Sequence, residues 1–264
     1  MTGESSMIAV RRVTKSFGGL VAVDDCSLDV VRGSITGLIG PNGAGKTTLF
    51  NIIAGFSVPE AGEILLEGEP VTGLSPNRLF HKGLVRTFQI PRVFDRMTVI
   101  DNLMLVPPAQ AGESLLATWL RPGRVVREES ENCRKAEEVL AILELPHLRN
   151  EYAGNLSGGQ KKLLELGRTM MVDPRVALLD EPGAGVNPVL LAKLCNNIAR
   201  LNRELGYTFC IIEHDMDLVA RLCDPIIVLA EGRVLAQGSM DEIRTDPAVL
   251  EAYLSRTVSR ADAP

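Results

Sequence analysis

GPNGAGKT, residues Gly40–Thr47, matches the pattern G-x-x-x-x-G-K-[ST] of a phosphate-binding loop. The short apolar segment 33–40 before it predicts a core strand. The segment 46–55 after it carries apolar residues at helical spacing and ends in glycine, which predicts a helix that stops there. A strand, a glycine-rich turn and a helix in this order are the context in which such a loop binds phosphate.

The residue types of this loop suit a nucleotide. Glycines let backbone N–H groups approach phosphate oxygens without a Cβ clash, and the N-terminus of the helix favours an anion. Lys46 can reach the β- and γ-phosphates, and the Thr47 hydroxyl can ligate Mg²⁺. The expected nucleotide contacts are Asn42, Gly43, Gly45, Lys46, Thr47 and Thr48. The loop alone therefore predicts ATP or GTP, with Mg²⁺.

Strand-like and helix-like segments alternate over much of the chain. Segments 7–17 and 19–31 alternate apolar and polar residues, as strands do. After residue 156, segments with a helical pattern (157–171, 188–205, 215–223) alternate with short apolar strands (175–180, 207–214, 225–239). This order predicts an α/β fold with a mostly parallel sheet flanked by helices.

The middle of the chain has a different character. Cys133, Ala136, Leu140 and Leu143 repeat at spacings of three and four, which predicts a helix over 127–145. Glu, Arg and Lys fill its other face, and we interpret that face as solvated. We expect a helical insert over 92–156.

Two adjacent carboxylates end the apolar run in LLDEPGAGVNPVL, residues Leu178–Leu190. Asp180 stands where phosphate-loop enzymes hold a metal, and Glu181 beside it can orient an attacking water. The alternative is an acidic pair that caps a helix. Asn187 precedes Pro188, and Pro is favoured at the first helical position. Asn187 is therefore expected to cap a helix, as Asp would.

Composition limits the function classes. The chain has 264 residues, 45% of them hydrophobic, and a net charge of −5, which disfavours nucleic-acid binding. Apolar runs are far below the ~18 residues of a membrane span, and the N-terminus lacks a signal-peptide pattern. The five Cys residues form no C-x-x-C pair, so they predict reduced thiols in a cytosolic protein rather than a metal site.

LSGGQ at Leu156–Gln160, upstream of RVALLDEP, resembles the signature of the ATP-binding cassette (ABC) ATPases. The resemblance covers nearly the whole chain, with the motifs in the family's order. It implies that Phe17 stacks on adenine, that Gln89 touches Mg²⁺ and water, and that His214 contacts the γ-phosphate. With the loop and the acids, the catalytic residues would be Glu181, His214, Lys46 and Gln89, and the metal ligands Thr47, Gln89 and Asp180.

The same resemblance implies a fold and an assembly. The fold is a phosphate-loop NTPase with a RecA-like parallel-sheet core, an N-terminal antiparallel β-subdomain and an inserted helical subdomain. One such domain would span 7–255, with the insert at 92–156 and a disordered tail at 256–264. Two cassettes would stack head to tail, so that each signature covers the ATP of the other. That contact would use Ser157, Gly158, Gly159 and Gln160.

Several longer segments look like the ATP-binding subunits of branched-chain amino acid importers, the LivG-type family. They include GLVRTFQIPRVFDRMTVIDNLML, IIEHDMDLVARLCDPIIVLAEGRVLAQGS and the ending DPAVLEAYLS. The resemblance implies integral-membrane permease subunits, a second ATPase subunit (identical or related) and, indirectly, a periplasmic or extracellular solute-binding protein. It also implies a place at the cytoplasmic face of the inner membrane. Candidate permease contacts are Ile90, Arg92, Val93 and Phe94, of which the last two could equally be core.

The same motifs also fit other transport functions. Similar cassettes power importers of urea, amides or aromatic acids, or lipopolysaccharide-type exporters. A soluble cassette acting on ribosomes or DNA is disfavoured by the single cassette, the short insert and the acidic balance.

Two further features give local predictions. Ala184, where most cassettes carry Ser, predicts weaker polar coupling across the dimer. Near the C-terminus, Leu250, Tyr253 and Leu254 are expected to pack back on the core after a helix start at Asp246-Pro247.

Overall fold

The structure, a computed structural model, describes residues 6–108, 110–113, 119 and 122–253. The chain forms two compact units. The first unit comprises Met1–Arg86, Arg175–Gly183 and Ala199–Pro264, and the second comprises Thr87–Pro174 and Ala184–Ile198. The predicted insert 92–156 falls within the second unit. Over the described residues, no helix combines the length and the apolar character that crossing a membrane requires.

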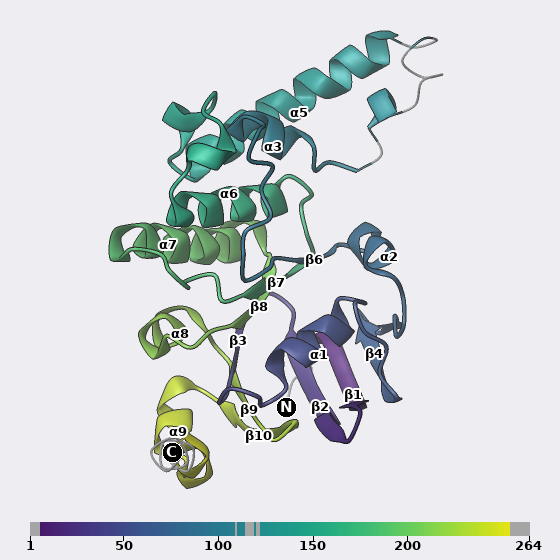
Figure 1. The fold of residues 1–264 in the computed structure, drawn as a ribbon, viewed down its shortest axis with the longest axis vertical. Helices are drawn as coiled ribbons and strands as arrows, with labels where there is room; N and C mark the ends of the chain where they lie inside the picture. Colours follow the sequence, from purple (N-terminus) through teal and green to yellow (C-terminus); the bar gives the residue numbers. More distant parts are fainter. Residues whose placement is uncertain (1–5, 109, 114–118, 120–121, 254–264) are drawn as a thin grey trace. The chain divides into compact units, whose positions relative to one another are not determined.

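A four-stranded antiparallel sheet opens the first unit (Figure 1). Its order is β2-β1-β4-β5, with β1 at Ser6–Phe17, β2 at Leu20–Val31, β4 at Ala61–Leu66 and β5 at Glu69–Pro70. β1 and β2 form a hairpin in which Phe17 pairs with Leu20 across Gly18-Gly19. The alternating pattern of 7–17 and 19–31 therefore correctly predicts two strands, and their pairing brings Phe17 to the hairpin end.

The second sheet of this unit has six strands in the order β10-β9-β3-β8-β7-β6. The strands are β3 (Ile35–Ile39), β6 (Leu84–Arg86), β7 (Val176–Asp180), β8 (Thr208–Ile212), β9 (Ile226–Ala230) and β10 (Arg233–Gly238). All neighbours are parallel except β10, which runs antiparallel to β9. Every residue of β3, β7 and β8 is buried, as expected for parallel strands covered on both faces. The prediction of a mostly parallel sheet is confirmed.

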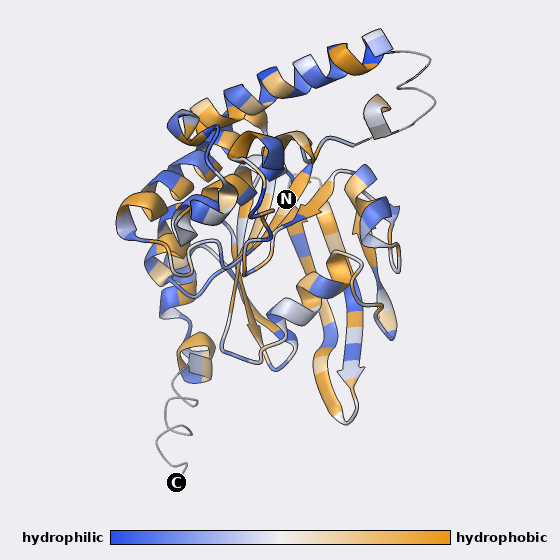
Figure 2. Ribbon diagram, turned by 45° about the horizontal axis from the view of Figure 1, so that its top comes forward, coloured by the Kyte–Doolittle hydropathy of each residue, from blue (hydrophilic) through white to orange (hydrophobic). Residues whose placement is uncertain are grey.

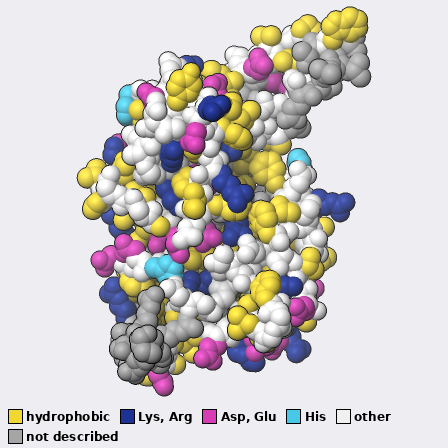
Figure 3. All heavy atoms as spheres, in the orientation of Figure 1, with side chains coloured by type: hydrophobic (Ala, Val, Ile, Leu, Met, Phe, Trp, Pro, Cys, Tyr) yellow, Lys and Arg dark blue, Asp and Glu magenta, His cyan; other side chains and the backbone are white. Residues whose placement is uncertain are grey.

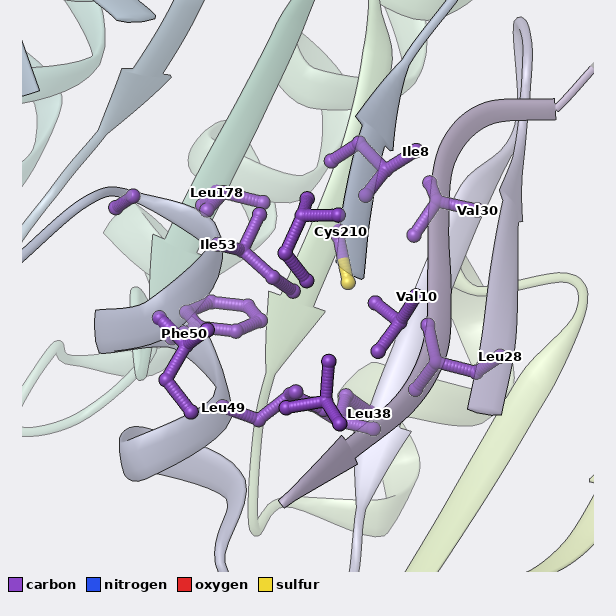
Figure 4. Packing of buried hydrophobic residues seen from close by; sticks show 14 of the residues in the cluster. Ile8, Val10, Leu28, Val30, Leu38, Leu49, Phe50, Ile53, Leu178 and Cys210 are labelled. Carbon is purple, nitrogen blue, oxygen red and sulfur yellow. The ribbon is translucent and has the colours of Figure 1, made fainter. Parts of the chain in front are cut away.

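The helix after the phosphate loop, α1 (Lys46–Ile53), supplies the centre of the main core. Its side chains Leu49, Phe50 and Ile53 point toward both sheets in Figure 4. They pack in one cluster with Ile8, Val10, Leu28, Val30, Leu38, Leu178 and Cys210. Full burial of each large apolar side chain stabilises the fold by about 1.5–3 kcal/mol. The start of α1, and with it the loop, is thereby fixed between the sheets.

Several other helices of the first unit are short. They are α2 (Pro76–His81), α8 (Met216–Leu222) and α9 (Met240–Thr245). Strands of the buried sheet appear as hydrophobic bands in Figure 2, whereas the helices carry hydrophilic faces. On the face drawn in Figure 3, basic and acidic side chains are interspersed, in keeping with the small net charge of −5.

The C-terminal turns at 247–253 begin as predicted, because Asp246 Oδ1 accepts hydrogen bonds from the backbone N–H groups of Ala248 and Val249. The prediction that Leu250 packs on the core is wrong. Leu250 is half-exposed, and its neighbour Val249 is buried instead, since the cap fixes which face of the helix turns inward. Burial raises the pKa of Tyr253, although a hydrogen bond with the Gly40 backbone opposes the shift. Leu254 and the tail 256–264 lie outside the described residues.

The second unit is helical (Figure 1). It contains α3 (Val99–Met104), α5 (Pro122–Ile142), α6 (Gly158–Met170), the start of α7 (Pro188–Leu205), and the 3-10 turns Ala111–Glu113, Pro146–Leu148 and Ala153–Asn155. Gly167 on α6 lets helices approach closely, because a Cβ there would lie 2.7 Å from Leu143 Cδ1 and 3.1 Å from Leu103 Cδ2.

Helix α5 differs from its prediction at both ends, since it runs over Pro122–Ile142 rather than 127–145. Glu144 adopts a left-handed conformation with φ 58°, and the Leu145 N–H donates to the Leu140 carbonyl at 2.8 Å. This bond is the C-terminal closure of a helix. The predicted inward face is confirmed at Ala136, Leu140 and Leu143, which are buried, whereas Cys133 is only half-buried.

Candidate functional site

The phosphate loop is a tight turn between β3 and α1. Two of its positions accept only glycine. A Cβ on Gly40 would lie 2.1 Å from the Leu229 carbonyl oxygen, and one on Gly45 would lie 2.3 Å from that of Ala22. Both glycines have positive φ, 147° and 97°. Side chains other than hydrogen are therefore excluded, and the loop backbone can face a ligand directly.

The Lys46 side chain folds back over this loop. Its Nζ donates to the carbonyl oxygens of Gly40 at 2.6 Å and Pro41 at 3.0 Å. The residue is 6% exposed, so the ammonium is held close to the curve rather than extended into solvent. A cation at this place, beside the N-terminus of α1, creates a local site for an anion.

A cavity of about 330 Å³ lies against the loop. Nine sequence-predicted residues line it: Phe17, Asn42, Gly43, Gly45, Lys46, Thr47, Thr48, Glu181 and His214. Leu20, Val21, Ala22 and Ala44 complete the lining, and the sequence did not single them out. The β1–β2 hairpin places Leu20, Val21 and Ala22 near Phe17, and Ala44 belongs to the phosphate loop itself, so their positions could have indicated them. Phe17 is 54% exposed, so its ring is available to a ligand.

Glu181 and His214 approach each other on the cavity wall. The His214 Nε2 atom lies 2.8 Å from Glu181 Oε1. Glu181 follows β7 in a left-handed conformation with φ 47°, and its backbone N–H donates to the Ile212 carbonyl at 2.9 Å. The predicted strand 207–214 ends earlier, at Ile212, so that His214 sits in the loop before α8. A carboxylate and an imidazole in contact can orient water and share a proton.

Asp180 does not cap a helix; it ends β7 as a buried carboxylate. Its Oδ2 accepts a hydrogen bond from Arg86 Nη2 at 3.0 Å, and Arg86 Nη1 donates to Asn51 Oδ1 at 2.6 Å. Arg86 therefore joins the end of β7 to α1. The sequence does not indicate this role for Arg86, because nothing in its local pattern separates it from a surface residue.

Gln89 and the signature residues lie in the second unit. The Gln89 carbonyl accepts a hydrogen bond from Lys162 Nζ on α6 at 2.6 Å. The Glu165 carboxylate, one turn further along α6, accepts from the Phe88 N–H at 3.3 Å. Burial raises the pKa of Glu165, although hydrogen bonds from the loop and nearby Lys162 and Arg168 oppose the shift. Charged side chains of α6 thus hold the backbone around Gln89.

The signature begins α6 with a capping box. Ser157 Oγ accepts from the Gln160 N–H at 3.3 Å, and Gln160 Oε1 accepts from the Ser157 N–H at 2.9 Å. Gly159 is in close contact with α7, since a Cβ would lie 2.7 Å from Leu190 Cδ1, whereas the Cβ position of Gly158 meets nothing within 4 Å. The predicted helix start is confirmed. Gly158 lies on the side of the helix that no neighbouring atoms cover.

The oxygen groups near the loop fit a small hard cation. Thr47 supplies a hydroxyl at the cavity, whereas Asp180 supplies a carboxylate at the end of β7 and does not itself line the cavity. Mg²⁺ favours such oxygen donors, and it commonly uses only one or two protein carboxylates together with water and phosphate oxygens. The described residues form no cluster of three or more His, Cys, Asp or Glu, so an all-protein metal cage is not part of the described structure.

Comparison with known proteins identifies the family. The family model described as ABC transporter matches residues 23–184, and the model described as branched-chain amino acid ATP-binding cassette transporter matches residues 233–254. Two relatives are 41% identical over 94% of this chain: a probable branched-chain amino acid transport ATP-binding protein LivG of Archaeoglobus fulgidus (95% of its length) and the high-affinity protein BraF of Pseudomonas aeruginosa (97%). LivG of Escherichia coli is 40% identical over 94% of this chain and 97% of its own.

Solved structures give the same result. A nucleotide-free ATP-binding cassette from an ABC transporter matches with a TM-score of 0.81 and 38% identity, covering 94% of this chain and 98% of its own. The ADP conformation of such a cassette matches with a TM-score of 0.79 and 36% identity, with the same coverage. These similarities confirm the predicted α/β phosphate-loop fold, and with the loop geometry they show that the chain belongs to the ABC transporter family as one of its nucleotide-binding cassette ATPases.

Proposed function

We propose that this chain is the ATP-hydrolysing subunit that powers an importer of branched-chain or other hydrophobic amino acids. The cavity that brings the phosphate loop together with Glu181 and His214 carries the ATPase part of this proposal. The importer class is supported by the relatives at 40–41% identity and by the match at 233–254.

Binding of ATP would use the whole cavity lining. The exposed ring of Phe17 would stack on adenine at one end. The backbone N–H groups of Asn42, Gly43, Gly45, Lys46, Thr47 and Thr48 would receive the phosphates. Lys46, already held over the loop, would add its charge at the β- and γ-phosphates.

Hydrolysis would depend on Glu181 and His214, which line the same cavity. Glu181 would orient water for in-line attack, with its carboxylate kept in place by His214 at 2.8 Å. His214 would contact the γ-phosphate, and Gln89 would help to place the water. These residues act by position and charge, which is where most catalysis of phosphoryl transfer comes from.

Thr47, Asp180 and Gln89 would hold Mg²⁺, whose chemistry is to neutralise charge on the phosphate oxygens. Asp180 would act only as a ligand of this ion. Arg86 and burial keep its carboxylate in one orientation.

The signature implies a facing cassette. Ser157, Gly158, Gly159 and Gln160 begin a helix of 13 residues, and such an N-terminus favours an anion. We propose that it covers the ATP of a second ABC ATPase subunit, identical or related, so that turnover requires a dimer. Ala184 has no side-chain hydroxyl, so it cannot form the hydrogen bond that Ser would form in that contact.

Permease subunits would bind near Gln89. Ile90 is 79% exposed and Phe94 is 51% exposed, which supports them as contacts for apolar membrane-subunit helices. Arg92 is exposed and Val93 half-buried, so Val93 contributes less to such a surface. Under this proposal the chain would act at the cytoplasmic face of the cell membrane, with a solute-binding protein acting indirectly and without a nucleic-acid partner.

The ATPase activity and the transport function can be tested separately with one variant. In purified protein, Glu181→Gln should bind ATP, slow turnover by about 100-fold or more and favour a stable dimer. Turnover at the wild-type rate in that variant would contradict the assignment of the base. In a deletion strain, the wild-type gene but not the Glu181→Gln gene should restore uptake of labelled leucine. Failure to restore leucine uptake, together with restored uptake of labelled urea, amides or aromatic acids, would reject the proposed solute class.

A further inference from the structure

Glu213 is a buried carboxylate next to the candidate site to which the proposed chemistry gives no role. It lies in the loop between β8 and α8, directly before His214, and is 4% exposed. Removing a carboxylate from water is costly unless hydrogen-bond donors replace the lost solvent. The N–H groups that donate hydrogen bonds to Glu213 therefore indicate what this buried carboxylate does.

Those donors come from two loops. Glu213 Oε1 accepts from the Gly183 backbone N–H at 2.6 Å. Glu213 Oε2 accepts from the His214 N–H at 3.0 Å, with the Asp215 N–H further away at 3.5 Å. Gly183 lies two positions after Glu181 in the chain. One carboxylate thus binds the backbone that follows the proposed water-orienting acid and the backbone of the proposed phosphate-contacting histidine.

Two other contacts join the same loops. The Glu181 N–H donates to the Ile212 carbonyl at 2.9 Å, and the His214 imidazole contacts the Glu181 carboxylate at 2.8 Å. The carboxylate of Glu213 closes the ring that runs from Glu181 through Gly183 and Glu213 to His214 and back to Glu181. A closed ring of short bonds leaves each loop little freedom to move without the other.

We propose that Glu213 is a positioning residue for ATP hydrolysis, which fixes the distance between Glu181 and His214 by holding the loop of Gly183 against the loop of His214. This inference rests on the proposed roles of Glu181 and His214. Glu213 is not among the described residues that line the cavity, so it acts through its neighbours. Displacement of a reacting group by about 1 Å can cost about 100-fold in rate, which makes such a brace consequential.

Two substitutions divide the functions of this carboxylate. Glu213→Gln keeps the length of the side chain but leaves one acceptor oxygen, so it can accept from only one of the two loops. Glu213→Asp keeps both oxygens but shortens the reach toward Gly183. As a matched control, Glu242→Gln alters another carboxylate that accepts a backbone N–H, in the capping box of α9, remote in sequence from both loops.

If Glu213 positions the pair, kcat for ATP falls about 10-fold or more in both variants, and KM for ATP stays within about twofold, because the phosphate loop is untouched. Glu242→Gln retains wild-type kcat. The imidazole signals of His214 should also move in the NMR spectrum of Glu213→Gln at fixed pH, and the chain has only three His to assign. A lowered melting temperature with kcat within twofold of wild type in both variants overturns the proposal.

A measurement on the wild-type protein without nucleotide tests the brace separately. The Gly183 amide should exchange with solvent on the order of 100-fold more slowly than an unstructured amide, since it is bonded to a buried carboxylate. Fast exchange would show that the brace does not persist in solution and would also overturn the proposal. A wild-type chain that turns over no ATP would instead count against the proposed function, whatever the exchange result.

Discussion

Arg86 Nη2 lies 3.0 Å from Asp180 Oδ2, and only 5% and 8% of the two side chains are exposed. A pair so deeply buried is strongly destabilised when one partner is removed, because the other charge remains in a low-dielectric environment. Arg86 also contacts Asn51 and lies over the rings of Phe50 and Phe56, so it connects β6, β7 and α1.

Replacement of Arg86 by Met should lower the free energy of unfolding by about 3 kcal/mol, measured by urea denaturation of the full chain. Arg12→Met is the control, because the Arg12 side chain in its pair with Asp25 is 82% exposed and should contribute about 0.5 kcal/mol or less. Equal effects of the two substitutions would show that the buried pair has no special importance.

The adenine contact is tested at Phe17. Phe17→Ala should raise KM for ATP about 10-fold while kcat changes little, since loss of a stacked ring typically costs about 1–3 kcal/mol of base binding. Phe17→Trp should retain tight binding. Val58→Ala removes an equally exposed apolar side chain outside the cavity lining and serves as the control. A KM unchanged in Phe17→Ala would reject stacking.

Asn187 is tested as a helix cap. Its Oδ1 accepts from the Leu190 N–H at 3.0 Å, which confirms the predicted cap of α7. Asn187→Ala should cost about 1 kcal/mol of unfolding free energy, whereas Asn187→Asp should be close to neutral, because the two residues cap about equally. Denaturation curves of the three proteins give both values, and an Asp variant as unstable as the Ala variant would contradict the role.

Glu67 gives a pH-dependent contribution to stability. Burial alone would raise its pKa, but hydrogen bonds from Arg32 and Arg175 outweigh it and the pKa is lowered. Its ionised form therefore stabilises the fold above the usual glutamate range, and this contribution is lost as the pH falls through the lowered pKa. At pH 7, Glu67→Gln should lose about 0.5–1 kcal/mol, because both arginines are substantially exposed.

The difference between wild type and Glu67→Gln should disappear in acid, as followed by unfolding at several pH values. Glu69→Gln breaks a more exposed pair with Lys82 and should show a weaker pH dependence. A difference that persists or grows in acid would contradict the ionic origin of the effect.

Much of the site could be predicted because its signals are local. The glycines at 40 and 45, the cap at Asn187 and the end of β7 at Asp180 each depend on neighbouring residues along the chain. Helix ends were less predictable. The C-terminal end of α5 depends on the left-handed conformation of Glu144, which the pattern of apolar residues does not indicate.

By itself, the sequence determined the phosphate loop, the order of strands and helices, and the residue types of the cavity, because spacing and backbone preference act within a few residues. Only the tertiary structure decided that Arg86 binds Asp180, that Glu213 binds Gly183 and that Lys162 binds the Gln89 backbone. Each of these bonds joins residues at least 30 positions apart. Such partners meet only after sheet order and helix packing are set, and no periodicity along the chain encodes which buried charge will face which donor.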